Sequence, residues 1–234
     1  MLKNRTYYKT NRQMAHSIAT SMAHPNCTII SIEGNVGSGK STFVQTLKEH
    51  FKDKPNVFIL PEPIDEWLQI KDEEGNILQH YYKDQKKYSF AFQMMAYISR
   101  LAILKKAMET GYEYIITERC LETDRHVFCQ MLYDDRFINE IEFQIYNKWF
   151  ECFVLKPFEK IYVYMKCDPE VAYERVKTRG RPEEAIPIEY LQKCHDYHDS
   201  WMKNMEPIMM DANQNVYKHP EVVQEWIRCI ERLM

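Results

Sequence analysis

The stretch Gly34-Asn35-Val36-Gly37-Ser38-Gly39-Lys40-Ser41 places two obligatory glycines, a lysine and a hydroxyl at the spacing of a phosphate-binding loop. In such a loop the backbone N–H groups point inward and hold an anion, and the following helix adds the partial positive charge of its N-terminus. We expect Lys40 to reach the β- and γ-phosphates of a nucleotide and the hydroxyl of Ser41 to coordinate Mg²⁺. The loop therefore predicts a site for a metal–nucleotide complex.

The residues on either side of the loop have the patterns that this motif requires. The apolar run 27–32 predicts a buried strand, and residues 41–51 carry apolar side chains at helical spacing. Strand, loop and helix thus follow one another in the expected order. The alternative is a glycine-rich turn between strand and helix that binds nothing, but the order favours a nucleotide site in an α/β fold.

Length and charge limit the class of protein. The chain has 234 residues, enough for one sizeable domain, which we place at 27–234 after an extension at 1–26. Lysine plus arginine (31) nearly balances aspartate plus glutamate (34), so a partner such as a nucleic-acid polymer or an anionic membrane is not expected. No apolar run approaches the roughly 20 residues of a membrane span. Small-molecule chemistry is favoured.

The location of the protein is predicted from its cysteines and its first residues. Seven cysteines, an odd number without a C-x-x-C pair, indicate reduced thiols and hence the cytoplasm. The first 32 residues contain no acid but include Lys3, Arg5, Lys9 and Arg12. This composition weakly indicates a transit peptide, which would make the mitochondrial matrix the alternative location.

Two predicted strands end in charged residues. The strand 57–60 is followed by Pro61-Glu62-Pro63. Ligands of open α/β sheets lie outside the carboxyl ends of the strands, so a carboxylate held between two prolines at that end is aimed at the site. Glu62 is the candidate general base. The alternative is an exposed glutamate in a turn.

The strand 112–117 ends in Glu118-Arg119. An acid at the end of a strand beside a phosphate-binding loop commonly supplies a second contact to Mg²⁺, and we expect Glu118 to do so. Arg119 is placed to hold the acceptor oxygen or the phosphoryl group in transfer. A surface ion pair is the alternative.

A long helix is predicted from residue 84 to about residue 109, closed by Gly111. One of its faces mixes side chains of different chemistry: Phe92, Gln93, Ala96 and Arg100. An amide can bond the edge of a base and a phenyl ring can stack on it, so this face is expected to line a nucleoside pocket. A partly exposed helix side is the alternative.

The rest of the chain predicts further helices at 121–133, 139–155 and 188–203, a strand at 160–166, a short fifth strand at Val216-Tyr217 and a closing helix from Pro220. The apolar stripe of the closing helix fits either the core or a dimer seam. A helix from Asp168-Pro169 to Gly180 is expected to lead into a lid at about 175–187. We assign no role to His195 and His198, because no third metal ligand accompanies them.

Five motifs together resemble the deoxyribonucleoside kinases over roughly residues 28–205. They are Ile32-Glu33-Gly34-Asn35 through Lys40-Ser41, Pro61-Glu62-Pro63 with Trp67, Phe92-Gln93 with Ser99-Arg100, Glu118-Arg119 with Asp124-Arg125, and Arg179-Gly180-Arg181 with Glu183-Glu184. The resemblance implies phosphoryl transfer from ATP, with Mg²⁺, to the 5′-hydroxyl of a deoxynucleoside. It also implies the P-loop NTPase fold, with a parallel five-stranded sheet wrapped by helices and a short arginine-rich lid, usually in a homodimer.

The same resemblance implies the roles of the site residues. The catalytic residues are Lys40, Glu62 and Arg119, with Glu62 as the base on the 5′-hydroxyl. The donor nucleotide is bound by Gly34, Asn35, Val36, Gly37, Ser38, Gly39, Lys40, Ser41 and Thr42, and by Arg175, Arg179 and Arg181 of the lid. Ser41 and Glu118 hold Mg²⁺. The nucleoside is bound by Glu62, Trp67, Tyr82, Phe92, Gln93, Ala96, Arg100, Arg119, Asp124, Phe128 and Glu184.

Within this last group, the rings of Phe92 and Phe128 are expected to enclose the base, and Gln93 is expected to hydrogen-bond its edge. Tyr82 with Glu184 is expected to hold the 3′-hydroxyl of the sugar.

Arg100 and Asp124 bear on which base is accepted. Deoxycytidine and deoxypurine kinases of the family have such a pair near the exocyclic group of the base, whereas thymidine-preferring members have apolar or small residues. Mismatched buried hydrogen-bonding groups disfavour thymine by about 1–3 kcal/mol per group. We predict deoxycytidine or a deoxypurine over thymidine.

Three other functions share part of this pattern. A nucleoside monophosphate kinase of the thymidylate type has the same loop and an arginine lid, but gives no reason for Pro61-Glu62-Pro63. A non-catalytic subunit with this fold in a larger assembly would be free to lose Lys40, Glu62 or Arg119, and all three are present. A regulatory nucleotide switch is less favoured, because it would not need the second substrate pocket that the sequence predicts.

Overall fold

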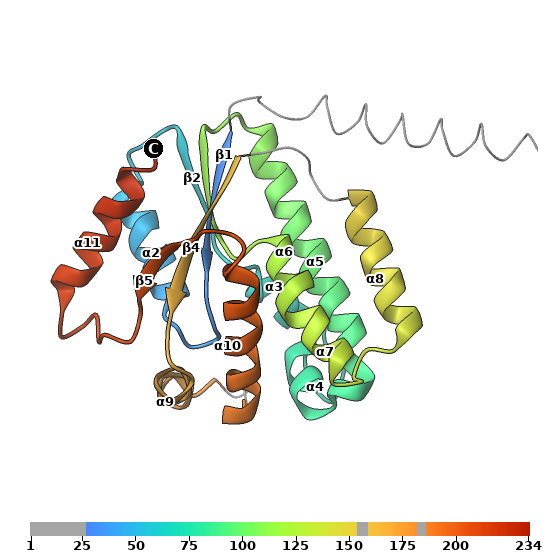
Figure 1. Ribbon diagram of the computed structural model, residues 1–234. Coiled ribbons are helices and arrows are strands. Elements are labelled where there is room, and N and C mark those ends of the chain that lie inside the picture. Colours follow the sequence, from blue (N-terminus) through green and yellow to red (C-terminus); the bar gives the residue numbers. More distant parts are fainter. Residues whose placement is uncertain (1–26, 154–158, 182–185) are drawn as a thin grey trace, which may run out of the picture.

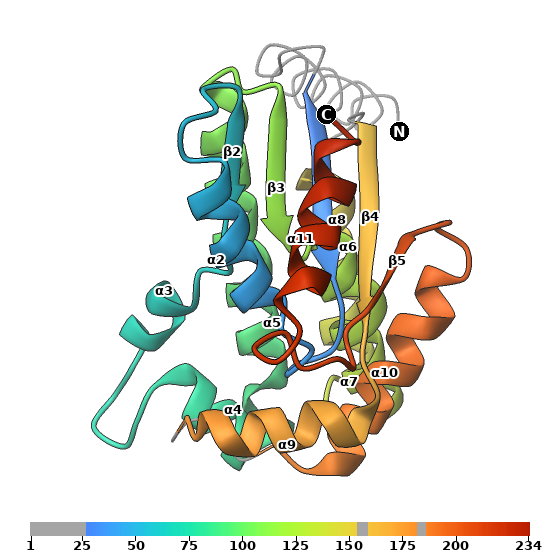
Figure 2. The ribbon, with the colours of Figure 1, turned by 90° about the vertical axis from the view of Figure 1, so that its left-hand side faces the viewer.

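The computed structural model describes residues 27–153, 159–181 and 186–234. Its centre is an all-parallel sheet in the order β2-β3-β1-β4-β5 (Figure 1). The strands are β1 (Thr28–Glu33), β2 (Val57–Leu60), β3 (Tyr114–Glu118), β4 (Glu159–Lys166) and β5 (Ile208–Asp211). Figure 2 shows that the strands point toward the end of the molecule where α4 and α9 lie.

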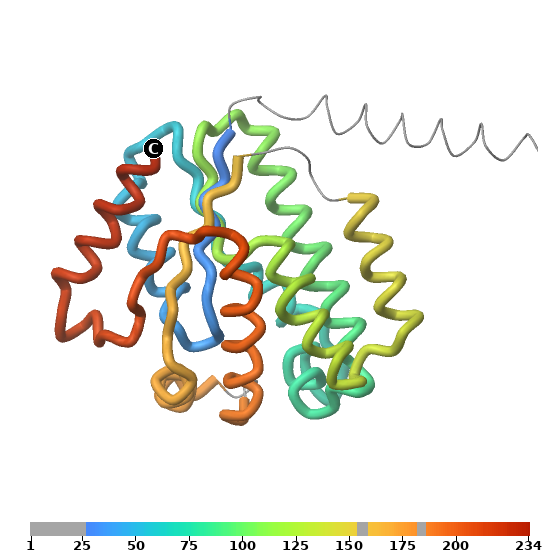
Figure 3. Tube along the Cα trace, viewed as in Figure 1, coloured from blue at the N-terminus to red at the C-terminus, as the bar shows by residue number. Residues whose placement is uncertain are grey.

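Helices cover both faces of the sheet, as parallel sheets require. They are α2 (Lys40–His50), α3 (Ile64–Gln69), α4 (Ile77–Lys83), α5 (Gln85–Glu109), α6 (Leu121–Thr123), α7 (Gln130–Asp134), α8 (Glu140–Phe153), α9 (Pro169–Arg179), α10 (Ile188–Met202) and α11 (Pro220–Glu231). In Figures 1 and 3, α2 and α11 lie on one face, and α5, α6 and α10 lie on the other, with α8 beyond α5.

The central strand β1 divides the core between these two faces. Ile30 and Ile32 pack in the cluster that includes α2 and α11. Ile29 packs instead with Leu104 of α5. Because side chains alternate along a strand, Glu33 at the end of β1 faces the α5 side, while the chain continues into α2 on the other side.

The closing helix α11 belongs to the core. Trp226, Ile227 and Ile230 are buried, and the ring of Trp226 lies 5.4 Å from that of Phe43 in α2. The apolar stripe of this helix is therefore covered by the sheet face, which settles the choice between core and dimer seam in favour of the core.

The prediction of a strand at Val216-Tyr217 is wrong. The fifth strand is Ile208–Asp211, which pairs with the end of β4. The backbone N–H groups of Tyr217 and Lys218 instead donate to Oδ1 of Asn215 at 3.0 and 3.3 Å. An asparagine side chain that satisfies the backbone in this way makes a turn, and the apolar pair after it does not extend.

The helix predicted at 121–133 is not regular. It consists of α6, the π-helix η1 (Asp124–Cys129) and α7. Helices α3 and α4 were not predicted, although Asn76 and Gln79 form a capping box at the start of α4. The other predicted helices and strands are confirmed to within a few residues.

Candidate functional site

The phosphate-binding loop joins β1 to α2 and is shaped by its glycines. Gly34, Gly37 and Gly39 have φ angles of 145°, 83° and 95°, which favour glycine. A Cβ atom at Gly37 would lie 2.5 Å from the backbone oxygen of Ala172 in α9. No side chain fits there, because the loop packs directly against α9.

Lys40, the first residue of α2, is buried and turns back over the loop. Its Nζ donates to the backbone oxygen of Asn35 at 2.6 Å and to Oγ of Ser38 at 3.4 Å. Burial, followed by the charge of Arg119, lowers the pKa of Lys40 to about 7. An anionic ligand beside Lys40 would favour its charged form, so the loop suits a phosphate group.

Two oxygen ligands suited to magnesium lie side by side below the loop. Oγ of Ser41 donates to Oε1 of Glu118, the last residue of β3, at 2.6 Å. The described residues contain no cluster of three or more His, Cys, Asp or Glu side chains that could hold a metal. Mg²⁺ typically takes one or two carboxylates and completes its shell with water and phosphate oxygens, so this donor set fits it.

Glu62 lies after β2, beside the end of β3, and is held by two arginines. Its Oε1 accepts hydrogen bonds from Nη1 of Arg119 at 2.8 Å and from Nη2 of Arg100 at 2.9 Å. Burial raises the pKa of Glu62, but the charges of Arg119, Arg100 and Lys40 outweigh this effect and lower it to about 2. Glu62 is therefore ionised at neutral pH, as a proton acceptor must be.

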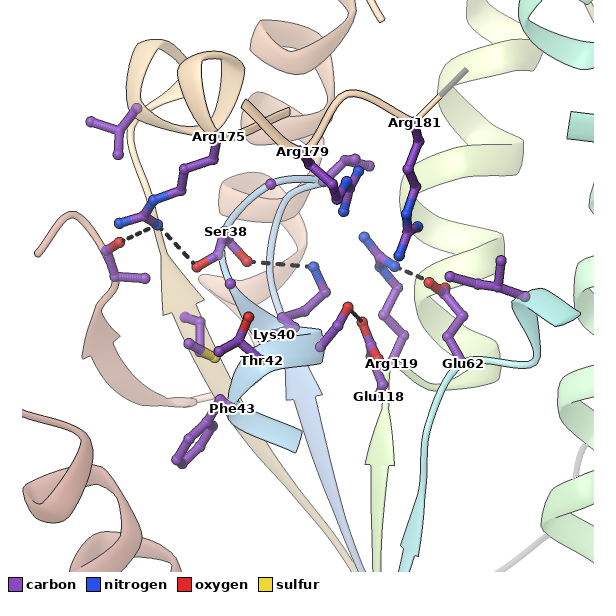
Figure 4. A pocket seen from close by; sticks show the side chains of 18 of the residues that line it. Ser38, Lys40, Thr42, Phe43, Glu62, Glu118, Arg119, Arg175, Arg179 and Arg181 are labelled. Atoms are coloured by element: carbon purple, nitrogen blue, oxygen red, sulfur yellow. Dashed lines mark hydrogen bonds and ion pairs between the residues drawn. The ribbon is translucent and has the colours of Figure 1, made fainter. Parts of the chain in front are cut away.

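Arg119 reaches Glu62 from an unusual backbone conformation. Its φ is 62°, in the left-handed region that residues other than glycine seldom adopt. Its Nη2 donates to the backbone oxygen of Gly34 at 3.4 Å. The side chain thus spans the space between the phosphate-binding loop and Glu62, as Figure 4 shows.

Arg100 joins Glu62 to Asp124. Nε of Arg100 donates to Oδ2 of Asp124 at 3.0 Å, and Nη1 donates to the backbone oxygen of Glu118 at 2.7 Å. The side chains of Arg100 and Asp124 are only 6% and 3% exposed. Asp124 begins the π-helix η1, a rare geometry that is frequent at functional sites.

A pocket with aromatic walls and one polar group lies beside this pair. Nε1 of Trp67 donates to Oγ of Ser99 at 2.8 Å, and the indole meets the ring of Phe92 edge to face at 5.4 Å. Gln93 is 2% exposed, and its Oε1 has no hydrogen-bond partner among the described residues. A buried amide oxygen without a partner costs free energy, so the pocket suits a flat ring with polar atoms at its edge.

One cavity of about 970 Å³ connects this pocket to the phosphate-binding loop. Of the predicted site residues, those that line it are Val36, Gly37, Ser38, Gly39, Lys40, Ser41, Thr42, Glu62, Trp67, Tyr82, Phe92, Gln93, Ala96, Arg100, Glu118, Arg119, Asp124, Phe128, Arg175, Arg179 and Arg181. Gly34 and Asn35 are not among its lining residues. Glu184 lies outside the described residues.

The arginines predicted to form a lid are not equivalent. Arg175 donates to the backbone oxygens of Ala212 at 2.7 Å, Gln214 at 3.0 Å and Ser38 at 3.3 Å. It therefore ties the phosphate-binding loop to the segment that follows β5. Figure 4 shows Arg179 and Arg181 extending toward the side where Lys40, Arg119 and Glu62 lie.

Some lining residues were missed by the sequence analysis. Tyr81 and Tyr190 share a hydrogen bond of 2.9 Å between their hydroxyls, and the segment 213–217 lines the other end of the cavity. The capping box of α4 was a usable signal for Tyr81. The family resemblance points to Asp211 and its neighbours as residues near the donor adenine, but we leave them unassigned because the position of this segment depends on where the edge strand ends.

Comparisons with known proteins show the family to which the chain belongs. A family model described as deoxynucleoside kinase matches residues 30–233. The chain is 33% identical over 196 residues to deoxycytidine kinase of Homo sapiens, with 74% of each chain covered. It is 31% identical over 214 residues to deoxycytidine kinase of Mus musculus, covering 82% of this chain and 81% of that protein.

A third relative is the mitochondrial deoxyguanosine kinase of Xenopus laevis, at 30% identity over 234 residues, covering 89% of this chain and 87% of that protein. The all-parallel sheet with its phosphate-binding loop is consistent with the P-loop NTPase fold expected for the family. The family match, the relatives and the cavity point to the same class of enzyme: the chain belongs to the deoxynucleoside kinase family, whose members phosphorylate nucleosides.

Proposed function

We propose that the chain transfers the γ-phosphoryl group of ATP to the 5′-hydroxyl of a deoxyribonucleoside, and that deoxycytidine or a deoxypurine is preferred over thymidine. The observation that carries this proposal is the shared cavity, which is lined by the phosphate-binding loop, by Gln93 and by Glu62, whose carboxylate accepts from Arg119 and from Arg100 of α5. A nucleoside whose base contacts Gln93 would direct its 5′-carbon toward Glu62. The acceptor hydroxyl would then face the donor phosphates.

Glu62 serves as the base in this proposal. It accepts the proton of the 5′-hydroxyl as the new oxygen–phosphorus bond forms. A carboxylate with a pKa of about 2 is a weak base, which suffices because phosphoryl transfer has a loose transition state that needs positioning more than early deprotonation. Arg119 holds Glu62 in place and neutralises charge beside the transferring group.

The loop residues and the lid bind the donor. The backbone of 34–39 and Nζ of Lys40 hold the phosphates, while Ser41 and Glu118 hold Mg²⁺. When bound, magnesium supplies charge neutralisation on the β- and γ-phosphates. Arg179 and Arg181 add positive charge on the lid side, where charge spreads over the phosphoryl oxygens.

The donor base would lie at the end of the cavity formed by residues 213–217. Arg175 fixes this segment to the loop through backbone oxygens, so its position relative to the phosphates is constrained. We propose that adenine occupies this end, with ATP as the donor.

The preference among acceptor bases rests on Arg100 and Asp124. Their paired, buried side chains would leave hydrogen-bonding groups mismatched against thymine. The relatives named deoxycytidine and deoxyguanosine kinase support the phosphorylation of a nucleoside, and the preference among bases rests on this pair alone. Trp67, Phe92, Ala96 and Phe128 would enclose the base.

Tyr82 lines the cavity, and we propose that it holds the 3′-hydroxyl of the sugar together with Glu184.

We also propose that the protein forms a homodimer through α8. Ile141, Ile145, Trp149 and Phe153 recur every four residues along this helix and are all exposed, from 41% to 70%. Ile98 of α5 is 45% exposed. A contiguous apolar stripe of this kind suits the self-complementary face of a two-fold interface.

Location is a separate proposal. No helix in the described ranges is long and apolar enough to cross a membrane. We propose that the protein acts in the cytoplasm, with the mitochondrial matrix as the alternative if residues 1–26 act as a transit peptide. Fluorescent fusions with and without these residues distinguish the two.

The proposed activity is tested by measuring initial rates with ATP, Mg²⁺ and each of the four deoxynucleosides. We expect a kcat/KM for deoxycytidine or a deoxypurine at least about tenfold above that for thymidine, which corresponds to roughly one mismatched buried group. Turnover of thymidine alone would contradict the base preference and keep the kinase activity. Substituting other nucleoside triphosphates for ATP tests the donor in the same assay.

A further inference from the structure

A buried carboxylate at the end of β1 takes no part in the transfer described above. Glu33 is 0% exposed and lies on the face of the sheet opposite α2. Its Oε1 accepts from Oγ of Ser31 at 2.5 Å, and its Oε2 accepts from Oγ1 of Thr123 at 2.7 Å. Burying a carboxylate is costly, and here two hydroxyl groups use both of its oxygens.

Thr123 connects this carboxylate to the nucleoside pocket. It is fully buried, ends α6 and immediately precedes Asp124, the first residue of η1. Its Oγ1 also accepts from the backbone N–H of Cys120 at 3.4 Å. The hydrogen bond to Glu33 therefore joins strand β1 to the start of η1, which begins with Asp124.

The neighbours of Glu33 on either side receive hydrogen bonds from the same segment. The backbone N–H of Arg119 donates to the backbone oxygen of Ile32 at 3.0 Å, and Nη2 of Arg119 donates to the backbone oxygen of Gly34 at 3.4 Å. Three consecutive residues, 32–34, thus hold the segment 119–123. We call these contacts the 32–34 clamp.

Two unfavourable backbone conformations lie within or directly after the segment 119–123. Arg119 has a φ of 62°, and η1 is a π-helix. Such conformations persist only where the surrounding structure holds them. The clamp holds the strained residue itself, through the hydrogen bond from Arg119 N–H to Ile32, and the start of η1, through the hydrogen bond from Thr123 to Glu33.

We propose that Glu33 and Thr123 are positioning residues: their hydrogen bond fixes Arg119 and Asp124 relative to the phosphate-binding loop. This inference rests on the proposed function for the roles of Arg119 and Asp124. Losing the bond displaces the arginine that holds Glu62 and the aspartate that discriminates bases. We then expect both the rate of phosphoryl transfer and the preference among bases to fall.

The phosphate-binding loop has attachments of its own. Nδ2 of Asn35 donates to the backbone oxygen of Leu191 in α10 at 2.9 Å, and Arg175 donates to the backbone oxygen of Ser38 at 3.3 Å. Loss of the Thr123 hydroxyl is therefore expected to move the segment 119–124 and to leave the donor site in place.

The test compares Thr123→Val with Ser31→Ala in the full chain. Ser31→Ala is the matched control, since it removes an equally buried hydroxyl from the same carboxylate without cutting the link to η1. We expect Thr123→Val to lower kcat/KM for the deoxynucleoside between about tenfold and about 100-fold, because a misplacement of about 1 Å costs on the order of 100-fold. The KM for ATP should stay within about twofold of the wild type.

Ser31→Ala should keep both kinetic parameters within about twofold even if its thermal midpoint falls, and Thr123→Ser should restore the wild-type rate. If Ser31→Ala and Thr123→Val lose the same activity, or Thr123→Ser fails to rescue, the residues only stabilise the fold and the proposal is wrong. Should Thr123→Val not fold, Glu33→Leu, which removes the acceptor of the Thr123 hydroxyl, replaces it, and we expect the same split between the two substrates.

Amide hydrogen exchange gives a readout that needs no turnover. Thr123→Val should speed exchange in residues 119–129 and leave residues 34–41 unchanged, and Ser31→Ala should change neither. Unchanged exchange in 119–129 overturns the clamp even if the enzyme is active. If the wild type does not phosphorylate any deoxynucleoside but Thr123→Val still exchanges faster in residues 119–129, the clamp is supported and the proposed function is wrong.

Discussion

Glu62 receives hydrogen bonds from Arg119 and Arg100, and its ionisation should be visible in the stability of the protein. Burial raises its pKa, but the two arginines and Lys40 bring it to about 2, from an ordinary value of 4.5. Because the folded-state pKa is the lower one, the stabilisation is fully present above about pH 4.5 and is lost as the pH falls toward 2.

Between pH 6 and pH 3, the free energy of unfolding of the wild type should therefore fall by about 2 kcal/mol more than that of Glu62→Gln. Urea unfolding at several pH values measures this difference. Glu66→Gln, which removes an exposed glutamate four residues away, is the control and should follow the wild type. Parallel curves for wild type and Glu62→Gln would show that the arginines do not hold an ionised Glu62.

Arg100 and Asp124 should decide which base the enzyme accepts. Replacing the buried pair together, as Arg100→Met with Asp124→Ala, removes the groups mismatched against thymine. We expect kcat/KM for thymidine relative to deoxycytidine to rise by roughly 10- to 100-fold, since each such mismatch is worth about 1–3 kcal/mol.

Arg100→Met alone leaves the buried carboxylate of Asp124 without its partner and should lower the free energy of unfolding by about 3–5 kcal/mol. Asp124→Ala alone leaves Arg100 paired with Glu62 and should lower it by less. Arg125→Met is the control, because the neighbouring Arg125 lies over the ring of Phe150 and does not line the cavity. An unchanged ratio of thymidine to deoxycytidine in the double variant would remove Arg100 and Asp124 from base selection.

The residues of the site were largely predictable and their contacts were not. Glu62, Glu118 and Arg119 could be identified because each follows a buried strand, and the face of Gln93 and Arg100 followed from helical spacing. The hydrogen bond from Arg100 to Glu62 could not be predicted, because it depends on α5 lying beside the ends of β2 and β3. The tie from Arg175 to the segment after β5 likewise needs the fold.

Among the elements, those with a strong local pattern were predicted and those fixed by tertiary contacts were not. β2 was predicted at its observed bounds, and α5 within one residue of its observed start. β5 was missed because it is a four-residue edge strand with one partner, β4. The spacing of apolar residues does not predict η1. The wider turn of this π-helix is stabilised by tertiary contacts such as the hydrogen bond between Thr123 and Glu33.

The exposed face of α8 leads to a prediction at the scale of an element. Trp149→Lys places a charge in the middle of the apolar stripe and should convert the proposed dimer to a monomer, because an unpaired charge would be buried at the interface. Sedimentation velocity measures this change. Gln224→Lys adds the same charge at an exposed position of α11 and should leave the dimer intact. A monomeric wild type at micromolar concentration would contradict the interface.

In the whole molecule, the parallel sheet aligns the residues of the candidate site along one edge. The order β2-β3-β1 places the phosphate-binding loop, Glu118 with Arg119, and Glu62 along one edge. α9 crosses that edge with its arginines, and α5 contributes Phe92, Gln93 and Arg100 to the cavity from one face. The order of strand, loop and helix sufficed to predict the fold class, whereas the depth of the shared cavity follows only from the packing of these elements.

We propose that Glu62 activates the hydroxyl of a deoxynucleoside in this cavity. The most direct test compares kcat for deoxycytidine, or for the deoxypurine that proves the better substrate, between wild type and Glu62→Gln at saturating ATP and Mg²⁺. Glu66→Gln serves as the matched control. We predict a loss in kcat of about 10²- to 10⁴-fold for Glu62→Gln, as expected for a general base, with the KM for ATP little changed. A Glu62→Gln enzyme that keeps the wild-type kcat would contradict the account.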